Sequence, residues 1–258
     1  MRRPGVPATA LAVGALVAAL LMGVRVAGTW QHRDIVAAHP SPTVTARPGG
    51  PAGSGRAGSR QDALGVQRVT GSADIALTFD DGPSPTWTPK VLDLLRANRV
   101  KATFCLVGAQ VHKYPALVAR IVREGHVLCN HSWIHDVKLG GRPAAAIRAD
   151  LVRTNAEIRK AVPGAKIAFF RQPGGRWTPA VVTIVRALGM IPLGWDVDPR
   201  DWEKPPARTI QQRVLTGVRP GSIVLLHDGG GDRTQTLAAC RSLLTQLRGR
   251  FHFVPMLP

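Results

Sequence analysis

Acidic residues are scarce in this chain of 258 residues: 16 Asp and Glu stand against 34 Lys and Arg, which gives a formal net charge of +18. The basic residues occur singly, without a dense block and without aromatic residues interleaved among them. This distribution argues against nucleic-acid binding, because nucleic-acid-binding domains gather their basic residues into one stripe or patch. The excess charge instead favours attraction to an acidic partner such as an anionic cell envelope.

Cysteine is scarce as well, with only Cys105, Cys129 and Cys240. Exported chains usually pair their cysteines, so an odd count leaves at least one unpaired. Cys105 and Cys129 fall in consecutive predicted strands, where a disulfide between them is geometrically possible. Burial of all three as small apolar side chains is the alternative.

Three kinds of sequence signature are missing. The chain contains no internal repeat, no glycine-rich phosphate loop after a strand, and no His-Glu-x-x-His motif. The first two absences argue against a repeat architecture and a phosphate-loop nucleotide site. The third excludes one large group of zinc hydrolases but leaves other zinc amidases and peptidases open.

The first 28 residues differ from the rest of the chain. Arg2 and Arg3 precede an apolar run that carries no charge until Arg25. At roughly 20 residues this run is long enough to span a bilayer, and a basic start before such a run is typical of a secretory signal or a signal anchor. The weak cleavage site at 26–28 favours an uncleaved membrane anchor, with cleavage and release as the alternative.

A stretch rich in Pro, Gly, Ala and Ser covers residues 29–68. It has too few large apolar residues to offset the entropy of ordering, so we expect a disordered, partly extended linker. The remaining residues, 69–258, form the predicted catalytic domain. This arrangement predicts a monomeric extracytoplasmic domain, anchored to or secreted from a bacterial cell envelope.

Short apolar stretches alternate with amphipathic helical patterns from residue 74 onward. Such alternation is typical of parallel strands that are buried on both faces. It predicts an α/β fold of the barrel type, with an open doubly wound sheet as the alternative. The seven predicted strands are 75–79, 102–107, 126–129, 167–170, 190–195, 222–226 and 252–256.

Polar side chains follow most of these predicted strands. In a parallel barrel the carboxyl ends of the strands share one face, and that face holds the active site. We therefore expect these side chains to converge, which favours a functional site over an ordinary polar turn for the adjacent acids in "LTFDDGP". The residues are Asp80, Asp81, Asn130, His131, His135, Arg171, Asp196, Asp198, Asp201, His227 and Asp228.

Two histidines in "HSWIH", His131 and His135, have the i, i+4 spacing common in zinc sites. Joined by one aspartate, they leave an open coordination position, as a catalytic metal requires. A hydrolase also needs a base for water and an acid for the leaving group. Arg171 could keep an aspartate base ionised through a bidentate pair. His227 could serve as the acid if Asp198 raises its pKa.

Five motifs occur in order along the domain: "TFDDGP" at 78–83, "HSWIH" at 131–135, "RQPGG" at 171–175, "DVDPRDW" at 196–202 and "IVLLHD" at 223–228. In this the chain resembles the polysaccharide deacetylase family, also called the NodB-homology domain or carbohydrate esterase family 4. The resemblance implies a distorted (β/α)7 barrel. It also implies metal-dependent hydrolysis of an acetyl group on a glycan, with zinc as the expected metal and cobalt or another divalent ion as a substitute.

The resemblance also implies roles for individual positions. Asp80 resembles the catalytic base and His227 the general acid, with Asp198 as the partner of the acid. Arg171 resembles the residue that orients and charges the base. The residues that resemble the metal triad are Asp81, His131 and His135, and those that resemble the apolar wall for the acetyl methyl are Trp202 and Leu225.

The third motif departs from the family pattern, because Gly174 replaces the usual aromatic residue. The backbone N–H at this position, which the family uses as an oxyanion donor, is retained, but the ring that walls the groove is lost. The expected substrate is N-acetylglucosamine of peptidoglycan. Chitooligosaccharide and acetylxylan are alternatives with the same chemistry, and a non-catalytic glycan-binding module is a more distant one.

Overall fold

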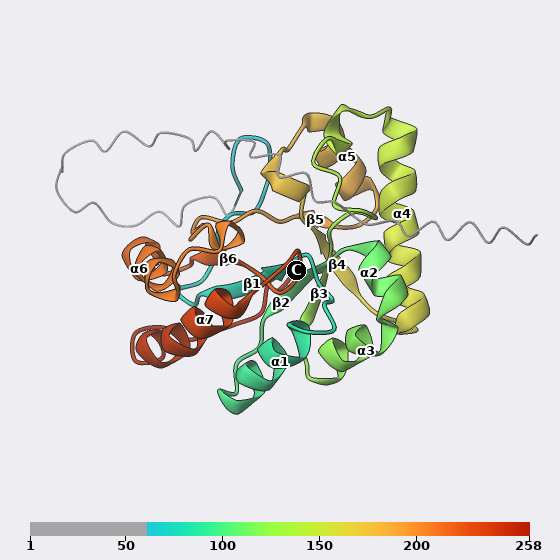
Figure 1. Cartoon of the computed structure of the whole chain (residues 1–258). Helices are drawn as coiled ribbons and strands as arrows, with labels where there is room; N and C mark the ends of the chain where they lie inside the picture. Colours follow the sequence, from blue (N-terminus) through green and yellow to red (C-terminus); the bar gives the residue numbers. More distant parts are fainter. Residues whose placement is uncertain (1–60) are drawn as a thin grey trace, which may run out of the picture. The chain divides into compact units, whose positions relative to one another are not determined.

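The computed structural model describes residues 61–258 (Figure 1). The apolar segment predicted at 1–28 and most of the predicted linker lie outside the described residues. Within 61–258, no helix has both the length and the apolar character needed to cross a membrane.

A six-stranded parallel sheet forms the centre of the domain, in the order β5-β4-β3-β2-β1-β6. Helices surround it, as parallel strands require for burial of both faces (Figure 1). The strands are β1 Ala76–Asp80, β2 Thr103–Leu106, β3 Val127–Asn130, β4 Ile167–Phe170, β5 Ile191–Pro192 and β6 Ile223–His227. The helices are α1 Thr88–Ala97, α2 Gly108–Lys113, α3 Pro115–Arg123, α4 Ala144–Ala161, α5 Pro179–Ala187, α6 Ala207–Gly217 and α7 Thr234–Leu247.

Short bridges connect the two edges of this curled sheet. Gln67 pairs with Leu193 beyond β5, Val69 pairs with Ser222 before β6, and Val197 pairs with Val224 in β6. Gln67 is 4% exposed, so this segment is part of the folded domain. The linker boundary predicted at residue 68 is therefore too late in the chain, because residues just before it complete the barrel.

The predicted seventh strand, 252–256, is wrong as a full strand. Its segment forms a single parallel bridge, between Ile75 and Phe253. Pro255 lacks the backbone N–H that a continued ladder would need. The chain end instead fills the inside of the barrel: Met256 is 1% exposed, and its N–H donates to the Thr103 Oγ1 at 2.9 Å.

Two apolar clusters result from the alternation of side chains along each strand. The outer cluster lies between sheet and helices and includes Leu77 and Phe79 of β1. The inner cluster is small and includes Ala76 of the same strand, together with the cysteines of β2 and β3 and Met256. Thr78 and Asp80 alternate with the outer residues of β1, so this strand presents polar groups to the barrel interior near its carboxyl end.

A disulfide joins Cys105 of β2 to Cys129 of β3, which are direct neighbours in the parallel register. Cys240 of α7 is buried and free. The structure thus decides between the two alternatives for the cysteines: one pair is bridged inside the barrel, and the third cysteine is a buried apolar side chain.

We expect loss of this disulfide to lower the free energy of unfolding. For the observed sequence separation of 24 residues, loop-closure entropy gives a stabilisation of about 3 kcal/mol. The double variant Cys105→Ala, Cys129→Ala should show this loss in urea unfolding. Cys240→Ala, which also truncates a buried cysteine but keeps the disulfide, is the matched control. Equal losses in both variants would contradict a stabilising role of the bridge.

Candidate metal centre and acid–base pair

The turn after β1 carries the two adjacent acids and is tightly packed. Asp81 has a left-handed backbone with φ of 72°, a conformation that Asp tolerates better than most residues. The Asp228 N–H donates to the Asp80 carbonyl at 3.1 Å. A Cβ on Gly229 would lie 2.2 Å from the Asp81 carbonyl oxygen, so only glycine permits this approach. The end of β6 thereby holds both carboxylates at the carboxyl ends of the strands.

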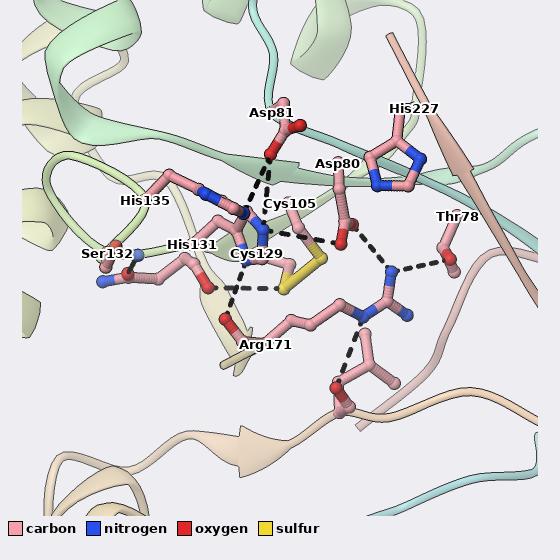
Figure 2. A network of polar contacts seen from close by, with 12 residues as sticks. Thr78, Asp80, Asp81, Cys105, Cys129, His131, Ser132, His135, Arg171 and His227 are labelled. Carbon is pink, nitrogen blue, oxygen red and sulfur yellow. Dashed lines mark hydrogen bonds and ion pairs between the residues drawn. A yellow bond between two sulfur atoms is a disulfide. The ribbon is translucent and has the colours of Figure 1, made fainter. Parts of the chain in front are cut away.

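Asp81, His131 and His135 form one cluster, as Figure 2 shows. Their ligand atoms all lie within 4.8 Å of one another. The Asp81 Oδ1 is 3.6 Å from His131 Nε2 and 3.4 Å from His135 Nε2. The structure therefore brings together the three residues that the sequence predicts as a metal triad.

The "HSWIH" segment is a loop rather than a helical turn. Ser132 and His135 both have left-handed backbones, with φ of 62° and 58°. The Ser132 N–H donates to the Asn130 side chain at 2.9 Å. The Nδ1–H of His131 donates to the Arg171 carbonyl at 2.8 Å, which fixes the tautomer and leaves Nε2 directed at Asp81.

The cluster fits a divalent cation. The Asp81 Oδ1 is buried and accepts no hydrogen bond from residues 61–258. Burial lowers the pKa of His131 to about 4, so its imidazole is neutral and able to bind a metal. Burial opposes ionisation of Asp81, but the positive charges of His135 and His227 are the main effects that outweigh it and hold the pKa below its ordinary value. Two imidazoles and one carboxylate suit zinc and leave a coordination position open.

Asp80 lies next to this cluster and pairs with Arg171 (Figure 2). Arg171 Nη1 donates to Asp80 Oδ1 at 2.7 Å, while Asp80 Oδ2 is 3.5 Å from His131 Nε2. The sequence led us to expect a bidentate pair, but the contact with Asp80 is made through Nη1 alone. The other guanidinium N–H groups of Arg171 donate to the carbonyls of Gly194 at 2.9 Å and Leu193 at 3.4 Å.

His227, at the end of β6, pairs with Asp201. Its Nδ1–H donates to the Asp201 Oδ1 at 2.6 Å, and Asp201 also accepts from Thr236. Burial alone would lower the pKa of His227, but the charge and hydrogen bond of Asp201 outweigh it and raise the pKa to about 9. His227 is therefore a cation at neutral pH, as a general acid must be.

The predicted partner of His227, Asp198, is wrong. Asp198 accepts from the Arg200 N–H at 2.8 Å within its own loop, and the His227 imidazole hydrogen-bonds to Asp201 instead. Asp201 begins a short 3-10 helix, η3 Asp201–Glu203, after a left-handed Arg200 with φ of 56°. The left-handed conformation of Arg200 redirects the chain, so that Asp201 rather than Asp198 faces β6. The spacing of acids in "DVDPRDW" alone does not distinguish the two.

Asp228 is a further residue of the site that sequence reasoning left without a role. It is completely buried and accepts a hydrogen bond from Thr88 of α1. A Cβ on Gly82 would lie 2.6 Å from both of its carboxylate oxygens. Asp228 therefore packs against the turn that carries Asp80 and Asp81. Its position directly after His227 was the only sequence signal for it.

The three residues predicted to contact substrate lie at the same end of the barrel. Leu225 is 4% exposed and alternates with His227 on the inner face of β6. Trp202 follows Asp201 in η3. Gly174 lies in a second 3-10 helix, η2 Pro173–Gly175, with a left-handed φ of 62° that glycine adopts without steric cost. Their contacts with an acetyl group stay predictions.

Residues 67–193 match the family described as polysaccharide deacetylase. A chitooligosaccharide deacetylase of Sinorhizobium fredii is 40% identical over 200 residues, which cover 73% of this chain and 92% of that relative. The chain belongs to the polysaccharide deacetylase family. The resemblance carried by the five sequence motifs is thereby confirmed.

Solved structures of polysaccharide deacetylases share the fold. The Bc1960 peptidoglycan N-acetylglucosamine deacetylase matches with a TM-score of 0.69 and 34% identity, over 72% of this chain and 86% of its own. BA3943 of Bacillus anthracis, a pseudoenzyme of carbohydrate esterase family 4, matches with a TM-score of 0.67 and 28% identity, over 72% of this chain and 64% of its own. These matches confirm the distorted barrel.

We expect zinc binding to depend on His135. In His135→Ala, zinc affinity should fall by more than the roughly 10–100-fold that follows loss of a residue that only orients a ligand. Competition with a chromophoric chelator measures this affinity. His112→Ala removes an exposed histidine that pairs with Glu157, and should leave the affinity unchanged. Equal zinc affinity in wild type and His135→Ala would show that the cluster is not the metal site.

The proton affinity of His227 should depend on Asp201 rather than on Asp198. In Asp201→Asn, the pKa of His227 should fall from about 9 toward or below the ordinary value of about 6.5, because the stabilising charge is removed while burial remains. Asp198→Asn should cause a much smaller change. Imidazole NMR titration of both variants measures this difference, and a larger shift in Asp198→Asn would contradict the assigned pair.

Proposed function

We propose that this polysaccharide deacetylase hydrolyses the N-acetyl group of N-acetylglucosamine in peptidoglycan. The observation that carries the proposal is the placing of an acid and a base beside one cluster of metal ligands. Asp80 is paired with a buried arginine, and His227 is held as a cation by Asp201. A hydrolase that releases an amine requires these two opposite proton states at the same place.

In the proposed reaction, one set of residues holds the metal and another transfers the protons. Asp81, His131 and His135 would hold the metal, zinc by preference, which when bound supplies a Lewis acid that polarises a carbonyl and makes water more acidic. Asp80 accepts the proton of the attacking water, and Arg171, which donates to Asp80 Oδ1 at 2.7 Å, orients this carboxylate. The His227 Nε2–H protonates the departing amine, since Nδ1 is engaged by Asp201.

The acetyl group would lie between these groups and an apolar wall. Leu225 and Trp202 are proposed to contact the methyl group. The Gly174 N–H is proposed to stabilise the negative charge that develops on the carbonyl oxygen. Gly174 supplies this N–H without the ring that the family pattern places there.

Peptidoglycan is proposed as the substrate for three reasons. The chain carries a net charge of +18, which favours an acidic polymer over a neutral one. A structural relative, Bc1960, is a peptidoglycan N-acetylglucosamine deacetylase. The predicted anchor or signal would place the domain at the cell envelope, where this polymer lies. The chitooligosaccharide deacetylase of Sinorhizobium fredii supports chitooligosaccharide as the second candidate.

Acetate release from a panel of glycans tests this proposal. Peptidoglycan, chitooligosaccharide and acetylxylan are each incubated with the protein, with and without a chelator. We expect release from peptidoglycan above all, loss of release with chelator, and recovery on addition of zinc. Mass spectrometry of the products should show deacetylated sugars and intact peptides. Binding of glycan without any acetate release would favour a non-catalytic module, as the similarity to BA3943 would allow.

Removal of either acid–base partner should slow the reaction strongly. Asp80→Asn and His227→Ala should each lower kcat by roughly 10²–10⁴-fold, the usual contribution of general acid–base catalysis. Asp93→Asn, a change to an exposed acid on α1 that pairs with Arg96 and Arg120, should retain full activity. Wild-type turnover in both Asp80→Asn and His227→Ala would refute the mechanism.

A further inference from the structure

An open hollow of about 580 Å³ is lined by two loops that also carry residues of the candidate site. One wall begins at Asp136, directly after the predicted metal ligand His135, and the other includes Arg176, directly after η2, and Thr178. The Thr178 hydroxyl donates to the Gly140 carbonyl at 3.4 Å, which joins the two walls. The lining residues are Asp136, Val137, Lys138, Gly140, Gly141, Arg142, Arg176 and Thr178.

The lining of this hollow is basic. It contains Lys138, Arg142 and Arg176 but only one acid, Asp136. That acid is already paired, since Arg142 Nε lies 2.6 Å from Asp136 Oδ2. Lys138 and Arg176 are both exposed, and neither forms an ion pair with a residue of 61–258. Two cations therefore face the hollow without a protein counter-charge.

Small residues make up part of the lining and leave space in the hollow. Val137 and two glycines contribute no long side chain. A Cβ on Gly140 would lie 2.9 Å from Thr178 Cγ2, but a Cβ on Gly141 would meet nothing within 4 Å, so the open space lies at Gly141. The space next to the cations is thus open to a ligand rather than filled by the protein. Arg and Lys bind carboxylates through charge-assisted hydrogen bonds, which are about twice as strong as neutral ones.

We propose that this hollow binds a carboxylate on the sugar next to the one that is deacetylated. The inference rests on the proposed function. Its geometric basis is that the two loops lining the hollow also carry His135 and Gly174. In peptidoglycan every second sugar carries a lactyl carboxylate or a peptide attached to it, whereas chitooligosaccharide is neutral throughout. Lys138 and Arg176 would then select an acidic glycan over a neutral one of the same length.

The double variant Lys138→Gln, Arg176→Gln tests this role. Two glycans of equal length are compared: one in which N-acetylglucosamine alternates with a sugar that bears the lactyl carboxylate, and one built from N-acetylglucosamine alone. An exposed ion pair contributes up to about 5-fold, so kcat/KM for the acidic glycan should fall by roughly 5–25-fold, through KM. For the neutral glycan it should change by less than about 2-fold.

The matched control is Arg159→Gln, Lys166→Gln, which removes the same number of exposed charges elsewhere. Lys166 directly precedes β4 and so lies at the opposite end of the strands from the site. The control variant should leave kcat/KM for both glycans unchanged. In the wild-type protein, the preference for the acidic glycan should weaken as the salt concentration is raised.

The outcomes separate this inference from the proposed function. Equal losses on both glycans, or no loss on the acidic one, would overturn the role of the hollow while deacetylation stands. Acetate release from neither glycan by the wild-type protein would contradict the proposed function itself. A selective loss on the acidic glycan, absent from the control, would establish the hollow as a carboxylate subsite.

Discussion

One buried cation positions most of the site. Arg171 is fully buried, and a buried charge is costly unless it is paired and hydrogen-bonded. Its guanidinium meets this requirement by donating to Asp80 and to the carbonyls of Leu193 and Gly194, while its own carbonyl accepts from His131. The base, one metal ligand and the chain beyond β5 therefore depend on a single side chain and its backbone. Removal of Arg171 would leave Asp80 buried without its cation.

Neighbouring groups give two histidines of the same site opposite charge states. Burial dominates at His131 and lowers its pKa to about 4. At His227 burial also opposes the charge, but the charge and hydrogen bond of Asp201, with the charges of Asp81 and Asp80, outweigh it and raise the pKa to about 9. One imidazole is thus free to bind a metal and the other to donate a proton at the same pH. The difference comes from partners more than from depth, since both rings are buried.

Sequence periodicity was sufficient for the strands and for the shared face of their polar ends, because both follow directly from burial on a parallel sheet. It led to Asp198 instead of Asp201 as the partner of His227, since both acids follow β5 in one loop and a left-handed Arg200 decides which of them faces His227. It also overestimated the last strand, where Pro255 ends the pairing. For the acid, the missing information was a backbone conformation that apolar patterns do not encode, whereas for the last strand the proline was present in the sequence and its missing N–H was not weighed.

Met256, near the end of the chain, is buried in the inner cluster of the barrel. The Met256 N–H donates to Thr103, the first residue of β2, so the chain end lies near the amino ends of the strands, and Met256 shares its cluster with Ala76 and the two bridged cysteines. Leu257, the next residue after Met256, is 64% exposed. A surface, resin or second protein attached through the final residue would therefore lie near the amino ends of the strands. The carboxyl ends, where the candidate site lies, would stay free for a large insoluble polymer.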